Sequence, residues 1–139
     1  MLETDELAKK LIGTWELVEF IMELANGETA HPLGKAAVGR LVYTENGFMS
    51  AHLMPGGDLP EETASKLTPE VSALSYCGGY RVQGDQILHD VDIGSRPGWT
   101  GTTRLRFAAF DAGELLLKTD GSHYGDLEGI GILRWRRMR

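Results

Sequence analysis

The chain has 139 residues, 42% of them hydrophobic and 24% charged, and its formal net charge is −6. This length fits one domain over residues 1–139. The acidic balance argues against a nucleic-acid partner, since phosphate backbones are bound by clustered Lys and Arg. No apolar run approaches the ~18 residues of a membrane-spanning helix, and residues 1–12 are too charged for a secretory signal. With Cys77 as the single cysteine, no internal disulfide can form, and we expect a cytoplasmic protein without a membrane partner.

The beginning of the chain predicts a short helix followed by a long strand. The run Thr4-Asp5-Glu6 places a capping residue and two acids at the start of a helix over about residues 5–11. Residues 13–24 then alternate, but both faces are apolar: Trp15, Leu17 and Ile21 on one, and Val18, Phe20, Met22 and Leu24 on the other. Such a strand must be covered on both sides. We interpret it as the first strand of a closed barrel, with the helix or a second subunit outside it.

Seven further segments with strand patterning follow, separated by turn signals such as Asn26-Gly27 and Asn46-Gly47. They lie at about residues 38–44, 48–54, 80–82, 86–93, 102–110, 114–119 and 129–136. Together with the first strand they predict an all-β fold, a closed antiparallel up-and-down β-barrel of about eight strands. A barrel of that size holds its own side chains or one small ligand.

Residues 55–75 differ in character from the strands around them. Asp58 and Thr68 each stand close to a proline and an acid, which is typical of helix starts. We therefore expect a short helical insertion between two barrel strands, placed as a lid over one end.

His89 stands out in the strand at 86–93. Alternation gives Ile87, Val91 and Ile93 to the core and the intervening aspartates to solvent, so His89 goes with the core. A lone histidine on an apolar face is commonly a structural residue with its hydrogen bonds satisfied. Alternatively, an imidazole with a pKa near ~6.5 in an apolar cavity is a natural proton donor or acceptor for a ligand.

The same alternation assigns the strand at 102–110. It places Leu105, Phe107 and Ala109 inside and Arg104 and Arg106 outside. The inner face of this strand is therefore predicted to be apolar.

The orientation of two polar side chains depends on the register of their strands. His52 shares a face with Phe48, Ser50 and Met54, and it points inward if that mixed face lines the cavity. Glu19 shares a face with Trp15, so it points inward too unless a β-bulge changes the register. Glu19 is then either a solvated residue at the rim or the acid–base partner of His89.

Five aromatic residues lie at strand ends or in loops and are candidates for the mouth of a pocket: Tyr43, Tyr76, Tyr80, Trp99 and Tyr124. Core packing is the default for Tyr43 and Tyr80. Trp99 lies among the turn-forming residues 96–101, where no periodic pattern requires it. We expect Trp99 to close over a cavity.

No metal or cofactor motif is present. The four histidines have no pair at metal-ligand spacing, and the chain lacks a phosphate-binding loop, a dinucleotide fingerprint and a nucleophile elbow. We therefore predict neither a metal nor a cofactor.

The order of several segments resembles the bacterial lipocalin-like domain family, from about Leu11 to Trp135. The resemblance is carried by residues 11–18, 31–34, 39–44 and 47–51 and by the hairpin from Gly79 to His89. The start Gly13-Thr14-Trp15 is also similar to the lipocalin first-strand signature, in which an arginine of the last strand lies across the tryptophan at the closed end. Arg134 or Arg136 is expected to fill that position.

The resemblance implies a barrel whose cavity binds a small, mostly apolar or amphipathic molecule. The ligand-binding candidates are Trp15, Leu17, Glu19, Tyr43, His52, Tyr80, His89, Trp99 and Phe107. Some barrels of this kind look like cofactor-free cyclases or isomerases, so the alternative is an enzyme with His89 and Glu19 as acid and base. A second alternative is a homo-oligomeric interaction module, such as a homodimer, because the first strand is apolar on both faces.

Overall fold

The computed structural model describes residues 3–57, 61, 73–124 and 127–139. Helix α1 (Thr4–Leu11) comes first, and the strands follow it in chain order: β1 (Gly13–Leu24), β2 (Thr29–Ala30), β3 (Val38–Tyr43), β4 (Phe48–Met54), β5 (Leu74–Gln83), β6 (Gln86–Gly94), β7 (Thr103–Asp111), β8 (Glu114–Thr119), β9 (Ser122–Tyr124) and β10 (Leu127–Arg137). No helix in these ranges is long and apolar enough to cross a membrane.

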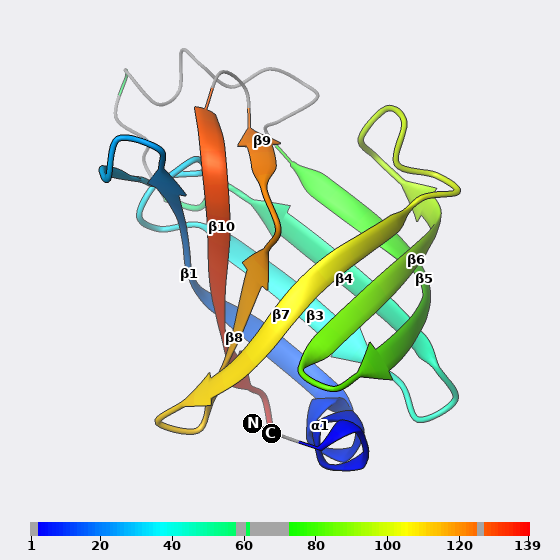
Figure 1. Ribbon diagram of the computed structural model, residues 1–139. Helices are drawn as coiled ribbons and strands as arrows, with labels where there is room; N and C mark the ends of the chain where they lie inside the picture. The colour runs from blue at the N-terminus through cyan, green and yellow to red at the C-terminus, as the bar shows by residue number, and fades with distance from the viewer. Residues whose placement is uncertain (1–2, 58–60, 62–72, 125–126) are drawn as a thin grey trace.

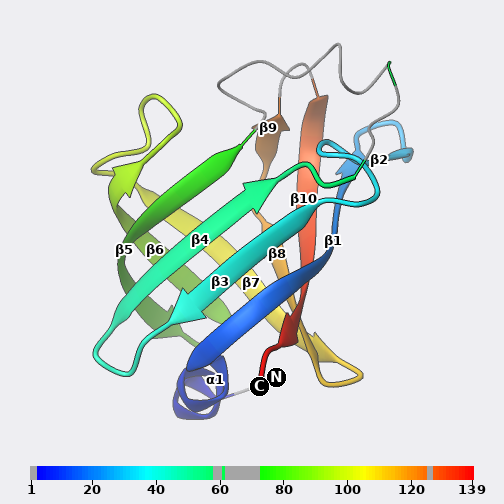
Figure 2. The ribbon, with the colours of Figure 1, turned by 180° about the vertical axis from the view of Figure 1, so that it is seen from behind.

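The long strands form a closed antiparallel barrel. Its hydrogen-bonded order is β1-β3-β4-β5-β6-β7-β8-β10, and the pairing of β1 with β10 closes it. The short strands β2 and β9 extend β1 and β10 at one end. Figure 1 and, from behind, Figure 2 show α1 lying across the opposite end. The predicted eight-stranded barrel with a short N-terminal helix is confirmed.

Strand β5 begins earlier than predicted. It runs from Leu74, although the sequence pattern started this strand at Tyr80 and ended the insertion at Ser75. The pair Gly78-Gly79 breaks the hydrophobic alternation, which explains the difference. The rest of the predicted helical insertion and lid falls mainly on residues 58–60 and 62–72, which lie outside the described ranges.

Gly78 supports a bulge in the hairpin of β5 and β6. Cys77 pairs with Ile93 while Gly78 pairs with Val91, so one residue of β6 is left unpaired. A Cβ atom on Gly78 would collide with the carbonyl oxygen of Asp90. After the bulge Ile93 faces solvent and is 68% exposed, so its predicted place in the core is wrong.

Trp15 closes the helix end of the barrel. It is 1% exposed, and its Nε1 donates to the carbonyl oxygen of Leu11 at 2.9 Å. The Arg137 guanidinium lies over the indole, 4.2 Å from the ring centroid, and donates to the carbonyl oxygens of Ile12 and Lys10. One cation therefore joins the end of α1, the start of β1 and the end of β10.

The arginine across Trp15 is Arg137, so the predicted Arg134 or Arg136 is wrong. Trp135 is buried in the barrel, and side chains two residues apart in a strand share a face. Arg137 therefore points to the same side as Trp135. Arg134 and Arg136 point outward, where both pair with the Glu114 carboxylate at 3.1 Å.

Replacing Arg137 by Ala should destabilise the barrel by about 1–3 kcal/mol, through loss of the cation–π contact and of hydrogen bonds to the end of α1. Urea unfolding followed by circular dichroism measures this. Arg139→Ala is the matched control, since Arg139 is exposed. Equal stability of the two variants would contradict this function of Arg137.

Replacing Gly78 by Ala should cost roughly 2–4 kcal/mol, because the new methyl group has no room beside the Asp90 carbonyl. The neighbouring Gly79→Ala should stay within about 1 kcal/mol of the parent, since the nearest atom to its Cβ would lie 3.7 Å away. The same unfolding measurement compares the two. A Gly78→Ala variant as stable as Gly79→Ala would show that the bulge tolerates a side chain.

Candidate functional site

A cavity of about 320 Å³ lies inside the barrel. Residues from the loop between β6 and β7 and from the end of β8 contribute to its wall. That loop lies at the end of the barrel away from α1 (Figure 1). Much of its wall is apolar and includes the residues Phe20, Leu41, Ala51, Leu53, Leu74, Trp99, Leu105, Leu117, Leu133 and Trp135. The polar residues of the wall are Tyr76, His89, Arg96, Thr103, Arg104, Arg106, Thr119 and Asp120.

Strand β7 turns two arginines into the barrel. Arg106 pairs with Ile87, which is fully buried, and Arg104 pairs with His89, which is 1% exposed. Residues directly opposite each other on antiparallel strands point to the same face. Arg106 is accordingly buried at 9% exposure. The predicted outward orientation of both arginines is therefore wrong.

Phe107 falls on the other face of β7. It pairs with Gln86, is half-buried and does not line the cavity. The predicted inward placement of Phe107 and Ala109 is wrong for the same reason, because their face of β7 is not the one that carries Arg104 and Arg106. Leu105, predicted inward with them, is half-buried and does border the cavity.

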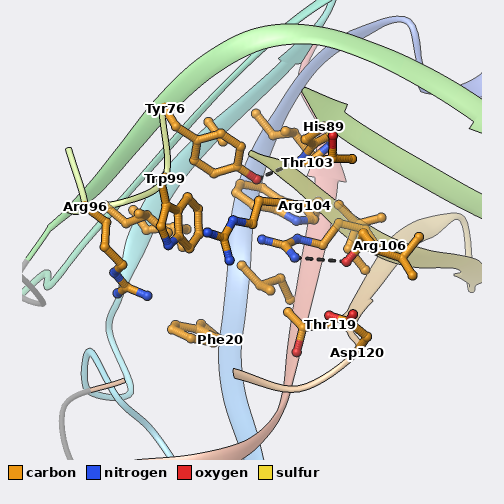
Figure 3. Close-up of a pocket in the computed structure, with 18 of the residues that line it drawn as sticks. Phe20, Tyr76, His89, Arg96, Trp99, Thr103, Arg104, Arg106, Thr119 and Asp120 are labelled. Atoms are coloured by element: carbon orange, nitrogen blue, oxygen red, sulfur yellow. Dashed lines mark hydrogen bonds between the residues drawn. The ribbon is translucent and has the colours of Figure 1, made fainter. Parts of the chain in front are cut away.

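Arg104 lies against the ring of Trp99 in the cavity (Figure 3). Its guanidinium carbon is 4.1 Å from the ring centroid, and that of Arg96 is 5.2 Å away. Burial and the positive charges of Arg106 and Arg96 lower the pKa of Arg104. The Nε atom of Arg104 is buried and, within the described part of the chain, has no hydrogen-bond partner.

The Arg106 guanidinium is the deeper cation. Its Nη1 donates to the backbone carbonyl of Leu105 at 3.0 Å. Among the residues that the structure describes, neither Arg106 nor Arg104 forms an ion pair with a carboxylate. Asp120 also lines the cavity, but its side chain is exposed.

His89 is held between two tyrosines. Its Nε2 lies 2.7 Å from the Tyr43 hydroxyl, and its Nδ1 lies 2.7 Å from the Tyr76 hydroxyl. Burial, reinforced by the charge of Arg106, holds the pKa of His89 well below its usual value. Burial likewise raises the pKa of Tyr43. The imidazole is therefore neutral near pH 7, and Tyr43 keeps its proton.

Comparison with known proteins identifies the family of this chain. The model of the lipocalin-like domain matches residues 12–138. The chain belongs to the lipocalin-like domain family. A search of curated proteins finds no match. Among solved structures, this lipocalin-like chain is similar to a mutant of the fluorescent protein UnaG, with 12% identity, a TM-score of 0.41, and coverage of 93% of this chain and 96% of that one.

Of the ligand-binding candidates predicted from sequence, His89 and Trp99 line the cavity of the lipocalin-like barrel. Trp15 instead fills the closed end. Tyr43 lies behind His89, outside the cavity wall. Tyr80 packs edge-on against Tyr43, with centroids 4.8 Å apart, and its hydroxyl donates to the Thr44 carbonyl. Tyr43 thus holds His89 through a hydrogen bond, and Tyr80 packs against Tyr43.

Glu19 lies outside the barrel, so the predicted pairing of Glu19 with His89 is wrong. The register of β1 against β10 shifts between Leu17 and Glu19, after which Phe20 is buried and Glu19 faces solvent. The Glu19 carboxylate, 49% exposed, lies 3.7 Å from Nε2 of His31. Leu17, just before the shift, is half-buried and does not line the cavity.

His52 also points away from the cavity. Strand β4 buries Met49, Ala51 and Leu53, which leaves His52 exposed on the outer surface. There its ring nitrogens bond the hydroxyls of Ser50 and Ser75. The mixed polar face of β4 is therefore the outer one.

Sequence reasoning names Tyr76 only as an aromatic residue for the mouth of a pocket, and it misses the arginines at 96, 104 and 106. The signal for the β7 arginines was indirect. His89 was placed inward, and a hairpin connection of β6 to β7 brings an arginine opposite it, but the loop of residues 95–102 conceals the register. Within the described residues, no group of three or more His, Cys, Asp and Glu side chains is placed to hold a metal ion.

Neutral His89 makes stability depend on pH. The unfolded chain protonates this residue near pH ~6.5, whereas the folded protein does so only at lower pH. The stability from keeping His89 neutral is thus complete above about pH 6.5 and is lost as the pH falls, by at most about 1.4 kcal/mol per pH unit. Urea unfolding between about pH 7.5 and pH 5 should show a steeper loss for the parent than for His89→Gln. Parallel curves would contradict the low pKa.

Proposed function

We propose that this lipocalin-like barrel binds a small amphipathic molecule that carries an acidic group, with no cofactor. The observation that carries the proposal is the pair of inward guanidinium groups, Arg104 and Arg106, in an otherwise largely apolar cavity. These two charges add an acidic group to the mostly apolar ligand expected from the sequence. The body of the molecule would be apolar, and one end would be anionic.

The size and lining of the cavity support an apolar body. A volume of about 320 Å³ is at the lower end of ordinary ligand pockets, which span roughly 300–1,000 Å³. Apolar side chains from β1, β3, β4, β8 and β10 contribute to its wall. Removing apolar ligand surface from water into this space supplies the non-directional part of the affinity.

The charges support an acidic group. A buried cation is costly unless it is paired, and an arginine fork suits carboxylates and other oxyanions. Arg106 is 9% exposed and Arg104 has its Nε buried, yet neither has a carboxylate partner in the described ranges. A ligand oxyanion between them would supply the missing counter-charge.

Trp99 is proposed to close over the ligand. It is 9% exposed although it comes from a loop, and its ring lies edge-on to Tyr76 at 5.2 Å and against Arg104. The ring therefore joins the apolar wall to the cationic part of the site. Because Glu19 is outside the barrel, its acid–base pair with His89 no longer supports an enzyme.

Two fluorescent probes test the charge requirement: anilinonaphthalene sulfonate, an anion, and N-phenylnaphthylamine, which lacks the sulfonate. Arg104→Gln and Arg106→Gln should each weaken binding of the anionic probe by roughly 10-fold or more, since hydrogen bonds to charged groups contribute about 1.5–3 kcal/mol. Binding of the neutral probe should change by less than about 2-fold, because its burial is apolar.

Arg40→Gln is the matched control, because Arg40 is exposed on the outer face of β3. It should leave both probes unaffected. Equal weakening of the anionic and neutral probes by the cavity variants would indicate a loss of shape rather than of charge, and would refute the acidic ligand.

A further inference from the structure

The two hydrogen bonds that link Tyr43, His89 and Tyr76 run in one direction. A neutral imidazole carries one N–H donor and one bare nitrogen acceptor. With hydroxyls at 2.7 Å from both ring nitrogens, one tyrosine must donate its proton to His89 and the other must accept a proton from it. The tyrosine that accepts keeps its own O–H hydrogen, which then needs another acceptor.

Burial decides which tyrosine accepts. Tyr43 is 1% exposed, does not line the cavity, and has His89 as its sole hydrogen-bond partner among the described residues. If Tyr43 accepted, its own hydrogen would be buried without a partner, at a cost of about 1–3 kcal/mol. Tyr76 lines the cavity, so its hydrogen can reach water or a ligand. The less costly arrangement therefore has Tyr43 donating to Nε2 and Nδ1–H donating to Tyr76.

We propose that Tyr43 and His89 together make the Tyr76 hydroxyl a fixed hydrogen-bond donor to the ligand. This inference rests on the proposed function and deepens it. Tyr76 lies on the cavity wall with Arg104 and Arg106 (Figure 3), so the groups offered here to a ligand are donors. The ligand class that fits is an oxyanion, a carboxylate or an enolate- or phenolate-type oxygen. A ligand with an amine at this position would leave these donors unpaired and would be rejected.

Nitrogen-15 NMR of His89 in the ligand-free protein tests the direction of the chain. The expected spectrum has Nδ1 protonated and Nε2 unprotonated near pH 7. The reverse tautomer, or a protonated imidazole, would overturn the inference. Because no ligand is present, this result does not depend on the proposed function.

Tyr76→Phe tests the donor itself. It should weaken binding of anilinonaphthalene sulfonate by about 10-fold or more, as expected for loss of a hydrogen bond to an anion. Binding of N-phenylnaphthylamine should stay within about 2-fold. Ser75→Ala removes the adjacent hydroxyl of β5, which bonds His52 on the outer face, and should change neither probe. Unchanged binding of the anionic probe to Tyr76→Phe would overturn the donor.

The outcomes separate the two proposals. In one outcome, His89 has the expected tautomer and Tyr76→Phe binds the anionic probe more weakly, but Arg104→Gln and Arg106→Gln bind it like the parent. That outcome would support Tyr76 as a donor and refute the arginine site. In the other outcome, the arginine variants bind the anionic probe more weakly but His89 has the reverse tautomer. That outcome would support the acidic ligand and overturn the proposed direction of the hydrogen bonds from Tyr43 through His89 to Tyr76.

Discussion

The buried charge of Arg106 acts on three other polar groups in the barrel: His89, Arg104 and Tyr43. It adds to burial in lowering the pKa of His89, and it contributes to the lowered pKa of Arg104. It partly offsets the effect of burial on the pKa of Tyr43. Burial, together with this cation, thus keeps the imidazole neutral. A neutral imidazole has one donor and one acceptor nitrogen, which gives the hydrogen bonds to the two tyrosines their direction. The same cation lacks a carboxylate partner in the described ranges, so this one charge underlies both the acidic group and the hydrogen-bond acceptor that we propose for the ligand.

Two bulges decide which side chains reach the barrel interior. The shift in β1 turns Phe20 inward and Glu19 outward, and the shift between β5 and β6 leaves Ile93 in solvent. Each shift inverts a strand's alternation without changing its composition. Gly78 indicates one of them, because its place beside the Asp90 carbonyl has no room for a Cβ atom. The β1 shift has no comparable marker among the residues around Leu17, which is why sequence alone could not place Glu19.

The sequence predicted the barrel and the helix well because local rules determine them. Alternation, Asn-Gly turns and the acids of the first helical turn are read residue by residue. The predicted cap, Thr4, is instead the first residue of α1, and the residue at the N-cap, Glu3, makes no side-chain cap hydrogen bond. The candidate site was predicted less well, because it depends on which of two alternating faces points inward. For β7 the usual preference for burying leucine and phenylalanine over arginine favoured the wrong face. Functional sites break that preference, and the pairing of Arg104 with His89 across β6 and β7 carries the correct assignment.

The stack of Arg137 on Trp15 and the stack of Arg104 on Trp99 use the same kind of contact for different purposes. Arg137 lies 4.2 Å from the centroid of Trp15, and Arg104 lies 4.1 Å from that of Trp99. The first guanidinium also donates to backbone carbonyls at the end of α1, so its hydrogen-bonding capacity is used within the fold. The second has a buried Nε without a partner in the described chain and faces a cavity. Cation–π geometry is therefore common to both arginines. What separates a structural arginine from one available to a ligand is whether the protein itself provides its acceptors.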